Sequence, residues 1–251
     1  PILVVIVGGY SNFPPYEFLD NEGRPSGYNV EITRAIADVM GIKVDIRLGE
    51  WDVMLNGLKA SKIDILQGIV ASDERSKTFS FSSPHAIIHH SVFARIGGIA
   101  PKGLAGLKGK AVMVQNKSIM YEYLLQNNVG ANIHPVTTHV EALRLLSSGE
   151  HDYALVANLP GLYLGREFGL SNLELVGKPF TSQRYGYGVL KGNESLVAEF
   201  SEGLAILKNT GKQQAIYNTW LGVLEQENSH IWQRYGLWAI SISLFSLLST
   251  A

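Results

Sequence analysis

The feature that most constrains the fold is a regular alternation of strand-like and helix-like segments at the start of the chain. Residues 2–8 are an apolar run and residues 43–48 alternate apolar and polar side chains, and both patterns are typical of strands. Residues 30–40 and 51–60 carry apolar side chains at helical spacing, and residues 64–68 are another short apolar run. This βαβαβ order predicts a parallel, doubly wound sheet with ligand contacts in the loops at the carboxyl ends of the strands.

A second unit of the same kind follows an extended stretch at residues 86–95. Its strands and helices are expected at residues 110–114, 118–126, 139–148 and 153–156. Another extended stretch, at residues 184–190, then leads into amphipathic helices at residues 193–208 and 212–220. Two long extended segments around one middle unit predict two crossovers between two lobes.

The lobes follow from those crossovers. We expect lobe 1 at residues 1–93 plus 186–225 and lobe 2 at residues 94–185, so that lobe 1 is completed by residues that follow lobe 2. Residues 226–251 form a C-terminal apolar tail. A chain of 251 residues, 46% of them hydrophobic, lies between one large domain and two of about 100 to 120 residues.

Composition and motifs exclude several classes of function. The net charge is −1 with basic and acidic residues interspersed, so no surface for nucleic acid is expected. There are no cysteines, which removes disulfides, thiol catalysis and thiolate metal sites. No GxGxxG, GxxxxGK[ST], GxSxG or HExxH motif occurs, so we expect no catalytic residues, no enzyme activity and no cofactor.

Three histidines lie close together at positions 85, 89 and 90. Spacing of four residues suits a metal ion on a helix, but this segment is predicted to be a strand, in which residues 85 and 89 lie ~13 Å apart. We therefore expect no metal site here.

The segment GIVASDERSKTFSFSSP, at residues 68–84, places Arg75 after a turn of small residues and before an aromatic strand. A guanidinium presents a rigid fork of donors that matches both oxygens of a carboxylate. The N–H groups of a loop rich in Gly, Ser and Asp can complete such a site. Arg75 is thus a candidate anchor for a carboxylate ligand, and a surface charge balancing Asp73 and Glu74 is the alternative.

Five segments in the same order resemble the extracellular solute-binding proteins of family 3, the polar amino acid type, a branch of the type II periplasmic binding fold. The segments are FPPYEFLDNEGRPSGYNVEI, WDVMLNGLKASKID, ASDERSKTFSFSSP, LKGKAVMVQNKS and GKQQAIYNTWLG, at residues 13–32, 51–64, 71–84, 107–118 and 211–222. The resemblance implies an α/β, two-lobed fold in which two doubly wound mixed sheets are joined by two hinge strands. It also implies that the lobes close over a small ligand.

Several site residues follow from that resemblance. Arg75 matches the arginine that binds the ligand's carboxylate, and Phe13 and Trp51 take the positions of aromatic walls. Three residues of the loop before Arg75 match positions that contact the ligand, the first two largely through the backbone: Gly68, Val70 and Ser72.

The second lobe departs from the family's pattern. Ser118 keeps a hydroxyl at a predicted helix start, while Lys117 replaces a usual glycine. Asn158 stands where amino acid binders of the family place an aspartate for the ligand's ammonium, and Tyr10 stands where binders of basic amino acids carry an acid. A desolvated ammonium without a counter-charge is costly, so these residues favour a carboxylate ligand without an ammonium group.

The tail predicts a link to a membrane. Residues 235–251 contain no charged side chain, but the apolar run is shorter than the ~20 residues of a membrane-spanning helix. It is either the start of such a helix, with Trp232, Tyr235 and Trp238 at the interface, or an apolar helix that packs on the body or on a second copy in a homodimer.

The sequence therefore predicts the periplasmic ligand-sensing domain of an inner-membrane receptor of the sensor histidine kinase type, part of a two-component signal-transduction system. It would bind a small carboxylate, such as an amino acid, between its lobes and signal by hinge closure. A soluble periplasmic binding protein of an ABC transporter is the first alternative, and a dehydratase-like enzyme on the same fold is the second.

Overall fold

The computed structural model describes residues 4–222 and 224 of the chain. The predicted opening alternation is present as β1 (Val4–Tyr10), α1 (Tyr28–Met40), β5 (Lys43–Gly49), α2 (Trp51–Lys59) and β6 (Ile65–Val70). Strand β1 pairs in parallel with both β5 and β6. The carboxyl ends of these strands therefore lie at one edge of the sheet, as the sequence predicted.

The buried face and the end of helix α1 both follow from its sequence. Ile32, Ile36 and Ala37 recur on one side of the helix and are buried. The helix ends at Gly41, which adopts φ 68° and donates its N–H to the Ala37 carbonyl. Only glycine enters this left-handed region without steric cost, so the residue stops the helix.

Three short strands between β1 and α1 were not predicted. They are β2 (Asn12–Phe13), β3 (Glu17–Leu19) and β4 (Pro25–Ser26), and they form a separate antiparallel sheet. Each is too short to produce a periodic signal in the sequence. This small sheet returns the chain to the end of β1, where the Tyr10 N–H donates to Glu17 Oε1 at 2.8 Å.

The second unit contains β9 (Ala111–Gln115), α3 (Ile119–Gln126), β10 (Asn132–Val136), α4 (His139–Ser147), β11 (Tyr153–Ala157) and α5 (Asn158–Glu167). Strand β9 pairs in parallel with β10 and β11. The sequence did not predict β10, which contains Pro135 and lies at the edge of the sheet, where a proline is tolerated. It also missed α5, whose Pro160 falls in the first turn and so breaks no helical hydrogen bond.

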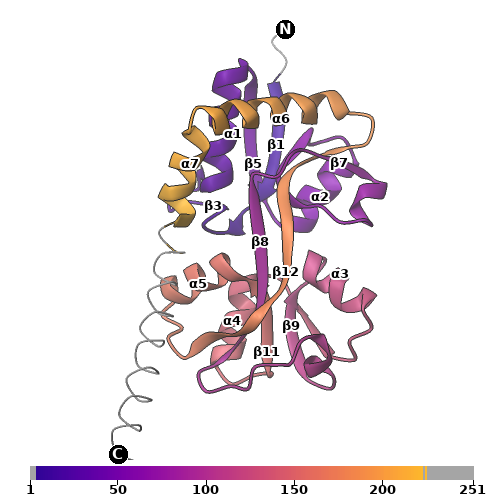
Figure 1. Cartoon of the computed structure of the whole chain (residues 1–251), viewed down its shortest axis with the longest axis vertical. Helices are drawn as coiled ribbons and strands as arrows, with labels where there is room; N and C mark the ends of the chain where they lie inside the picture. The colour runs from indigo at the N-terminus through magenta and orange to yellow at the C-terminus, as the bar shows by residue number, and fades with distance from the viewer. Residues whose placement is uncertain (1–3, 223, 225–251) are drawn as a thin grey trace, which may run out of the picture.

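Two long strands run between the units. They are β8 (Ala86–Arg95) and β12 (Leu173–Leu190), which pair antiparallel side by side and cross from the upper to the lower group of elements in Figure 1. Strand β12 begins earlier than predicted. Its pairing with β8 shifts between Val176 and Thr181, and because the residues between them resemble a loop in the sequence, the first part of the strand was not recognised.

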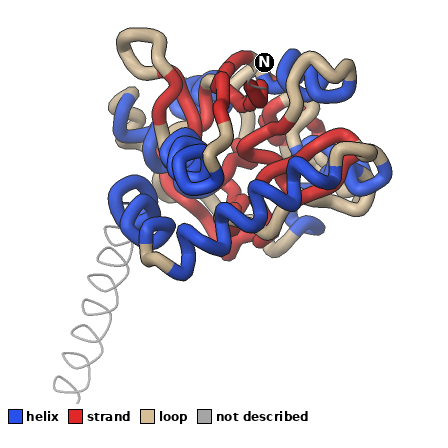
Figure 2. The backbone as a smooth tube through the Cα atoms, turned by 90° about the horizontal axis from the view of Figure 1, so that it is seen from above, coloured by secondary structure: helices blue, strands red, loops and turns tan. Residues whose placement is uncertain are grey.

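These two strands also join the predicted sheets into one hydrogen-bonded path. The order is β10-β9-β11-β8-β12-β6-β1-β5, and β7 (Phe79–Phe81) pairs with β12 outside that path. The parallel strands of each unit thus lie on opposite sides of the β8–β12 pair. Seen from above, the strands occupy the interior and the helices lie outside them (Figure 2).

Helices α6 (Glu194–Asn209) and α7 (Lys212–Tyr217) return to the first unit and pack beside α1, followed by a π-helical turn at Asn218–Gly222. Gly203 of α6 allows the close approach, since a Cβ there would lie 2.6 Å from Ile36 Cγ2. Within residues 4–222 and 224, no helix has the length and apolar character needed to cross a bilayer. The predicted tail, residues 226–251, lies outside the described residues.

Candidate functional site

A cavity lies where the carboxyl ends of the β1 and β6 strands meet the second unit. Its free volume is about 60 Å³, which is room for a few water molecules. Seven of the nine residues predicted from the sequence line it: Tyr10, Phe13, Trp51, Gly68, Val70, Arg75 and Ser118. Ser72 and Asn158 do not.

Arg75 is the one arginine among the described residues that line this cavity. It begins a 3₁₀ turn (Arg75–Lys77) after β6, and its side chain is 6% exposed. Nη1 donates to the Val70 carbonyl and Nη2 to Glu122 Oε1, each at 3.2 Å. The guanidinium carbon lies 5.6 Å from the centre of the Trp51 ring.

The guanidinium is not saturated by these contacts. Arg75 Nε and Glu122 Oε2 are both buried, and neither has a hydrogen-bond partner in the described part of the chain. Burial lowers the pKa of Arg75, while the nearby Glu122 carboxylate raises it. Arginine stays protonated in proteins, so this site holds a buried cation with an unused donor.

Ser72 supports Arg75 instead of lining the cavity. Its hydroxyl accepts the Arg75 N–H at 3.2 Å, and its carbonyl accepts the Ser76 N–H at 2.8 Å. The side chain is therefore used inside the turn that positions the arginine.

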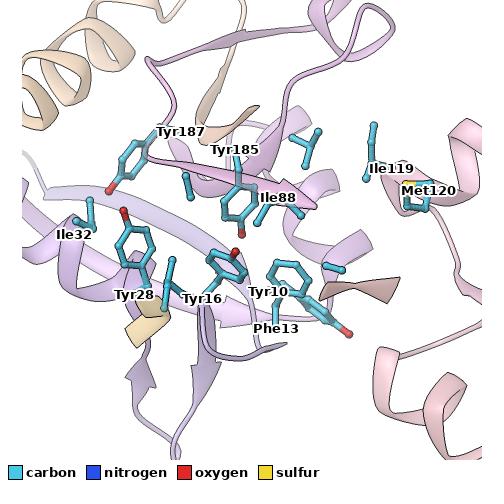
Figure 3. Close-up of a cluster of buried hydrophobic side chains, with 14 of the residues drawn as sticks. Tyr10, Phe13, Tyr16, Tyr28, Ile32, Ile88, Ile119, Met120, Tyr185 and Tyr187 are labelled. Atoms are coloured by element: carbon cyan, nitrogen blue, oxygen red, sulfur yellow. The ribbon is translucent and has the colours of Figure 1, made fainter. Parts of the chain in front are cut away.

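An aromatic wall stands beside the arginine. The Phe13 ring is stacked on Tyr16 with centroids 5.4 Å apart, and it lies 6.1 Å from Tyr185 and 6.4 Å from Tyr10. In Figure 3 the rings of Tyr28, Tyr16, Phe13 and Tyr10 follow one another, and Tyr185 lies above Tyr16. On the other side, Trp51 Nε1 donates to the Lys117 carbonyl at 3.3 Å, which ties the first unit to the second.

Behind the wall lies a buried carboxyl group, Glu17, which is 1% exposed and also lines the cavity. Its Oε1 accepts the Tyr10 N–H, and its Oε2 accepts Asn29 Nδ2 and Gln67 Nε2, both at 3.0 Å. Burial raises the pKa of Glu17 to about 7, although these hydrogen bonds oppose the shift. Both carboxyl oxygens are thus already hydrogen-bonded within the protein.

Gly68 is the residue that leaves room for this network. A Cβ at Gly68 would lie 2.1 Å from Tyr185 Oη and 2.5 Å from Asn29 Nδ2. These two groups are themselves hydrogen-bonded at 3.0 Å. A larger residue would therefore disrupt both the cavity floor and the hinge strand that carries Tyr185.

The second unit contributes the start of α3. Ser118 is the N-cap, and its hydroxyl oxygen accepts the Tyr121 N–H at 3.2 Å while its own proton remains able to donate. Lys117 has φ 56°, a conformation that glycine adopts without strain. Its ammonium group forms an ion pair with Asp52 at 3.2 Å.

Asn158 is displaced from the cavity. It is the first residue of α5 and borders a different cavity, with Tyr16 and His89. Leu155 is the residue of this segment that reaches the main cavity. The sequence analysis assigned no helix at residue 158, whereas α5 begins there.

The sequence prediction missed five lining residues with polar groups: Glu17, His90, Gln115, His139 and Tyr185. Burial lowers the pKa of His90 to about 3 and that of His139 to about 4, so both imidazoles are neutral. Recognising β10 would have placed His139 at the carboxyl end of a parallel strand, where ligand contacts are expected. His90 could have been assigned from the alternation of β8.

Comparisons with known proteins identify what the chain resembles. Residues 5–223 match the family model of bacterial extracellular solute-binding proteins, family 3. The L-cystine-binding protein TcyJ of Escherichia coli strain K12 is 29% identical over 220 residues, which cover 87% of this chain and 82% of that protein. The arginine-binding periplasmic protein of Mannheimia haemolytica is 27% identical over 84% of this chain and 88% of its own length.

Solved structures of periplasmic binding proteins and of a sensor domain are also similar to this chain. A histidine kinase sensor domain with similarity to periplasmic binding proteins has 47% identity and a TM-score of 0.84, covering 87% of this chain and 96% of that domain. An ancestral arginine-binding protein bound to glutamine has 28% identity and a TM-score of 0.78, over 87% and 98% of the two chains. The predicted fold class, the type II periplasmic binding fold, is confirmed.

Proposed function

The chain belongs to the bacterial extracellular solute-binding proteins of family 3, and from that membership we propose that its cavity binds a small solute through a carboxylate group. The observation that carries the proposal is the buried Arg75 guanidinium in the cavity wall, with Nε unpartnered among the described residues. A bound carboxylate would accept from Nε and Nη2 together, which is the strongest geometry available to an arginine.

The proposed binding step is a closure of two lobes, residues 1–93 plus 186–225 and residues 94–185, about the β8 and β12 strands. Three contacts support it, since each joins the first unit to α3 or to the loop before that helix. Arg75 pairs with Glu122, and Lys117 bonds both Trp51 and Asp52. Ligand that contacts both sides would raise the closed population in proportion to its preference for that state.

The cavity also bears on the ligand's charge. The cystine-binding and arginine-binding relatives suggest an amino acid, and these ligands carry an α-ammonium. Asn158 lies outside the cavity and therefore says nothing about the charge of the ligand. The carboxyl group in the described lining, Glu17, has both oxygens occupied. Glu122 Oε2 lacks a partner, but that carboxylate is already paired with Arg75, so a carboxylate without an ammonium group suits the site better than an ordinary amino acid.

For the biological role we propose a periplasmic sensor domain of a membrane-bound histidine kinase. Its support is the sensor domain that is 47% identical over 87% of this chain, well above the transporter-type relatives at 25–29%. Closure would then be transmitted to sequence that follows the described residues. A soluble ABC transporter binding protein is the alternative, which those relatives favour, and a gene that encodes a kinase region after residue 251 would exclude it.

The test of the binding site is a calorimetric titration with small carboxylates and amino acids. Arg75→Ala should lower the affinity of any carboxylate that binds by at least about 2 to 5 kcal/mol, because the anion loses its bidentate partner. Arg75→Lys should not restore it, since an ammonium lacks the planar fork. Arg47→Ala is the matched control, because Arg47 is exposed and pairs with Asp45 away from the cavity. Near-normal affinity in Arg75→Ala would refute the assignment.

A further inference from the structure

Three residues that line the cavity have a buried polar side-chain atom without a hydrogen-bond partner among the described residues: Tyr10, Arg75 and His139. Buried polar groups in proteins are almost always hydrogen-bonded, so an unpartnered group that faces a cavity is available to a ligand or to water. Arg75 accounts for one carboxylate. We propose that Tyr10 and His139 form a second anion-binding subsite in the same cavity, so that the solute is a dicarboxylate, an inference that rests on carboxylate binding at Arg75.

Tyr10 supplies the first donor of this subsite. It is the last residue of β1, is 4% exposed, and its hydroxyl points away from those of Tyr16 and Tyr185 in Figure 3. Burial and the nearby Glu50 carboxylate raise the pKa of Tyr10, and the neighbouring Gln115 side chain opposes that shift, so the phenol keeps its proton. A protonated phenol that faces a cavity offers its O–H to an acceptor.

His139 supplies the second donor. It is the first residue of α4 and is 6% exposed, and its ring lies 5.4 Å from Phe13 and 6.5 Å from Tyr10. Its unpartnered atom is Nδ1. A neutral imidazole carries one N–H and can place it on either nitrogen, so Nδ1 can donate to an anion. The N-terminus of α4 adds a favourable dipole for negative charge.

The charges around the subsite agree with an anionic partner. The other ionisable side chains that line the cavity are Arg75 from the 3₁₀ turn, His90 from β8 and Glu17 from β3, together with the phenol of Tyr185 from β12. Each oxygen of Glu17 already accepts a hydrogen bond from the first unit. The three unpartnered groups can all donate, and the carboxylate with an unpartnered oxygen beside the cavity, Glu122, is already paired with Arg75. The complement of such a cavity is a molecule with an acceptor at each end.

The test uses defined probes: α,ω-dicarboxylates from malonate to adipate, with the monocarboxylate and the monoamide of each chain length. Dissociation constants are measured by calorimetry on the wild-type protein. At the best chain length, the dicarboxylate should bind at least about tenfold more tightly than either analogue, because hydrogen bonds to a charged group are worth more than those to a neutral one. Equal affinities for the diacid and its monoamide at every length would overturn the second subsite.

Two variants locate the subsite. Tyr10→Phe removes only the hydroxyl, and His139→Leu removes the imidazole; each should reduce the preference for the diacid over the monoacid by at least about threefold. Tyr187→Phe is the matched control, since Tyr187 is a fully buried tyrosine outside the cavity that bonds Thr33 at 2.8 Å. A preference unchanged in both cavity variants would overturn the assignment, and if a variant fails to fold, the monoamide comparison in wild type decides.

The two proposals fail differently. If monocarboxylates bind through Arg75 and dicarboxylates bind no better, the second subsite is wrong and the proposed function stands. If no carboxylate binds at any length, the proposed function is wrong as well.

Discussion

Glu122 competes with a carboxylate ligand for the Arg75 guanidinium. The ion pair between them, at 3.2 Å, occupies the same edge of the guanidinium that a bound carboxylate would use. Glu122 is 29% exposed on its side chain, so its attraction is partly screened by solvent. The pair therefore serves as a replaceable contact between β6 and α3.

Glu122→Gln should accordingly strengthen carboxylate binding. The amide competes less well for the guanidinium, and a partly exposed ion pair contributes about 0.5 to 1 kcal/mol, so we expect a gain of about two- to fivefold. Calorimetry on this variant and on Glu199→Gln, an exposed carboxylate of α6, measures it. A weaker affinity in Glu122→Gln would instead mean that Glu122 contributes to holding the ligand.

At this scale the three residues that the sequence singled out, Arg75, Phe13 and Trp51, all line the cavity, because each follows closely after a strand that was itself predictable. The sequence could not place Asn158, since Pro160 and Gly161 concealed the start of α5. Their role in binding stays a prediction until a ligand is measured.

Among the elements, three neutral histidines are buried: His85 just before β8, His90 within β8 and His139 at the start of α4. Burial lowers the pKa of His85 to about 4, of His90 to about 3 and of His139 to about 4. In the unfolded chain a histidine titrates near 6.5, so below that pH the unfolded state binds more protons than the folded state. Each of these histidines thus stabilises the fold above about pH 6.5 and loses that contribution as the pH falls towards its folded pKa.

Glu17 acts in the opposite direction. Its folded pKa of about 7 lies above the ordinary value of 4.5, so the folded state holds the extra proton between those values and is stabilised as the pH falls. In this pH range the three histidines bind more protons in the unfolded state than the one glutamate binds in the folded state. The free energy of unfolding should therefore decrease from pH 6.5 to 4.5, by up to about 1.4 kcal/mol per pH unit for each net proton.

Urea denaturation between pH 7.5 and 4.5 measures this dependence. His85→Gln should flatten the curve, because one buried imidazole is removed, whereas His89→Gln, an exposed position on β8, should leave its slope as in wild type. Stability that stays constant or rises between pH 6.5 and 4.5 would contradict the burial of neutral imidazoles.

The elements also show what periodicity can and cannot reveal. Helices with a full apolar face, such as α1 and α6, were predicted within two residues at each end. The short strands β2 to β4 depend on pairing with one another, and β12 contains a register shift, so neither has a local signal that distinguishes it from a loop.

For the whole molecule, two extended segments in the sequence were enough to predict two crossing strands. Residues 86–95 coincide with β8, and residues 184–190 are the end of β12. The sequence did not indicate that β8 and β12 pair along most of their length and unite all the parallel strands in one path. That pairing depends on contacts between residues about 90 positions apart, which no local pattern records. We propose that the lobes move about this pair of strands, β8 and β12.

The most direct measurement of carboxylate binding between two lobes is a crystal structure of the protein with the tightest-binding carboxylate from the titrations. We expect one carboxylate of the ligand within about 3 Å of Arg75 Nε and Nη2, with Glu122 displaced from the guanidinium and the ligand against the Phe13 ring. A ligand bound elsewhere on the surface, or a complex in which Arg75 remains paired with Glu122 and makes no contact with the ligand, would contradict it.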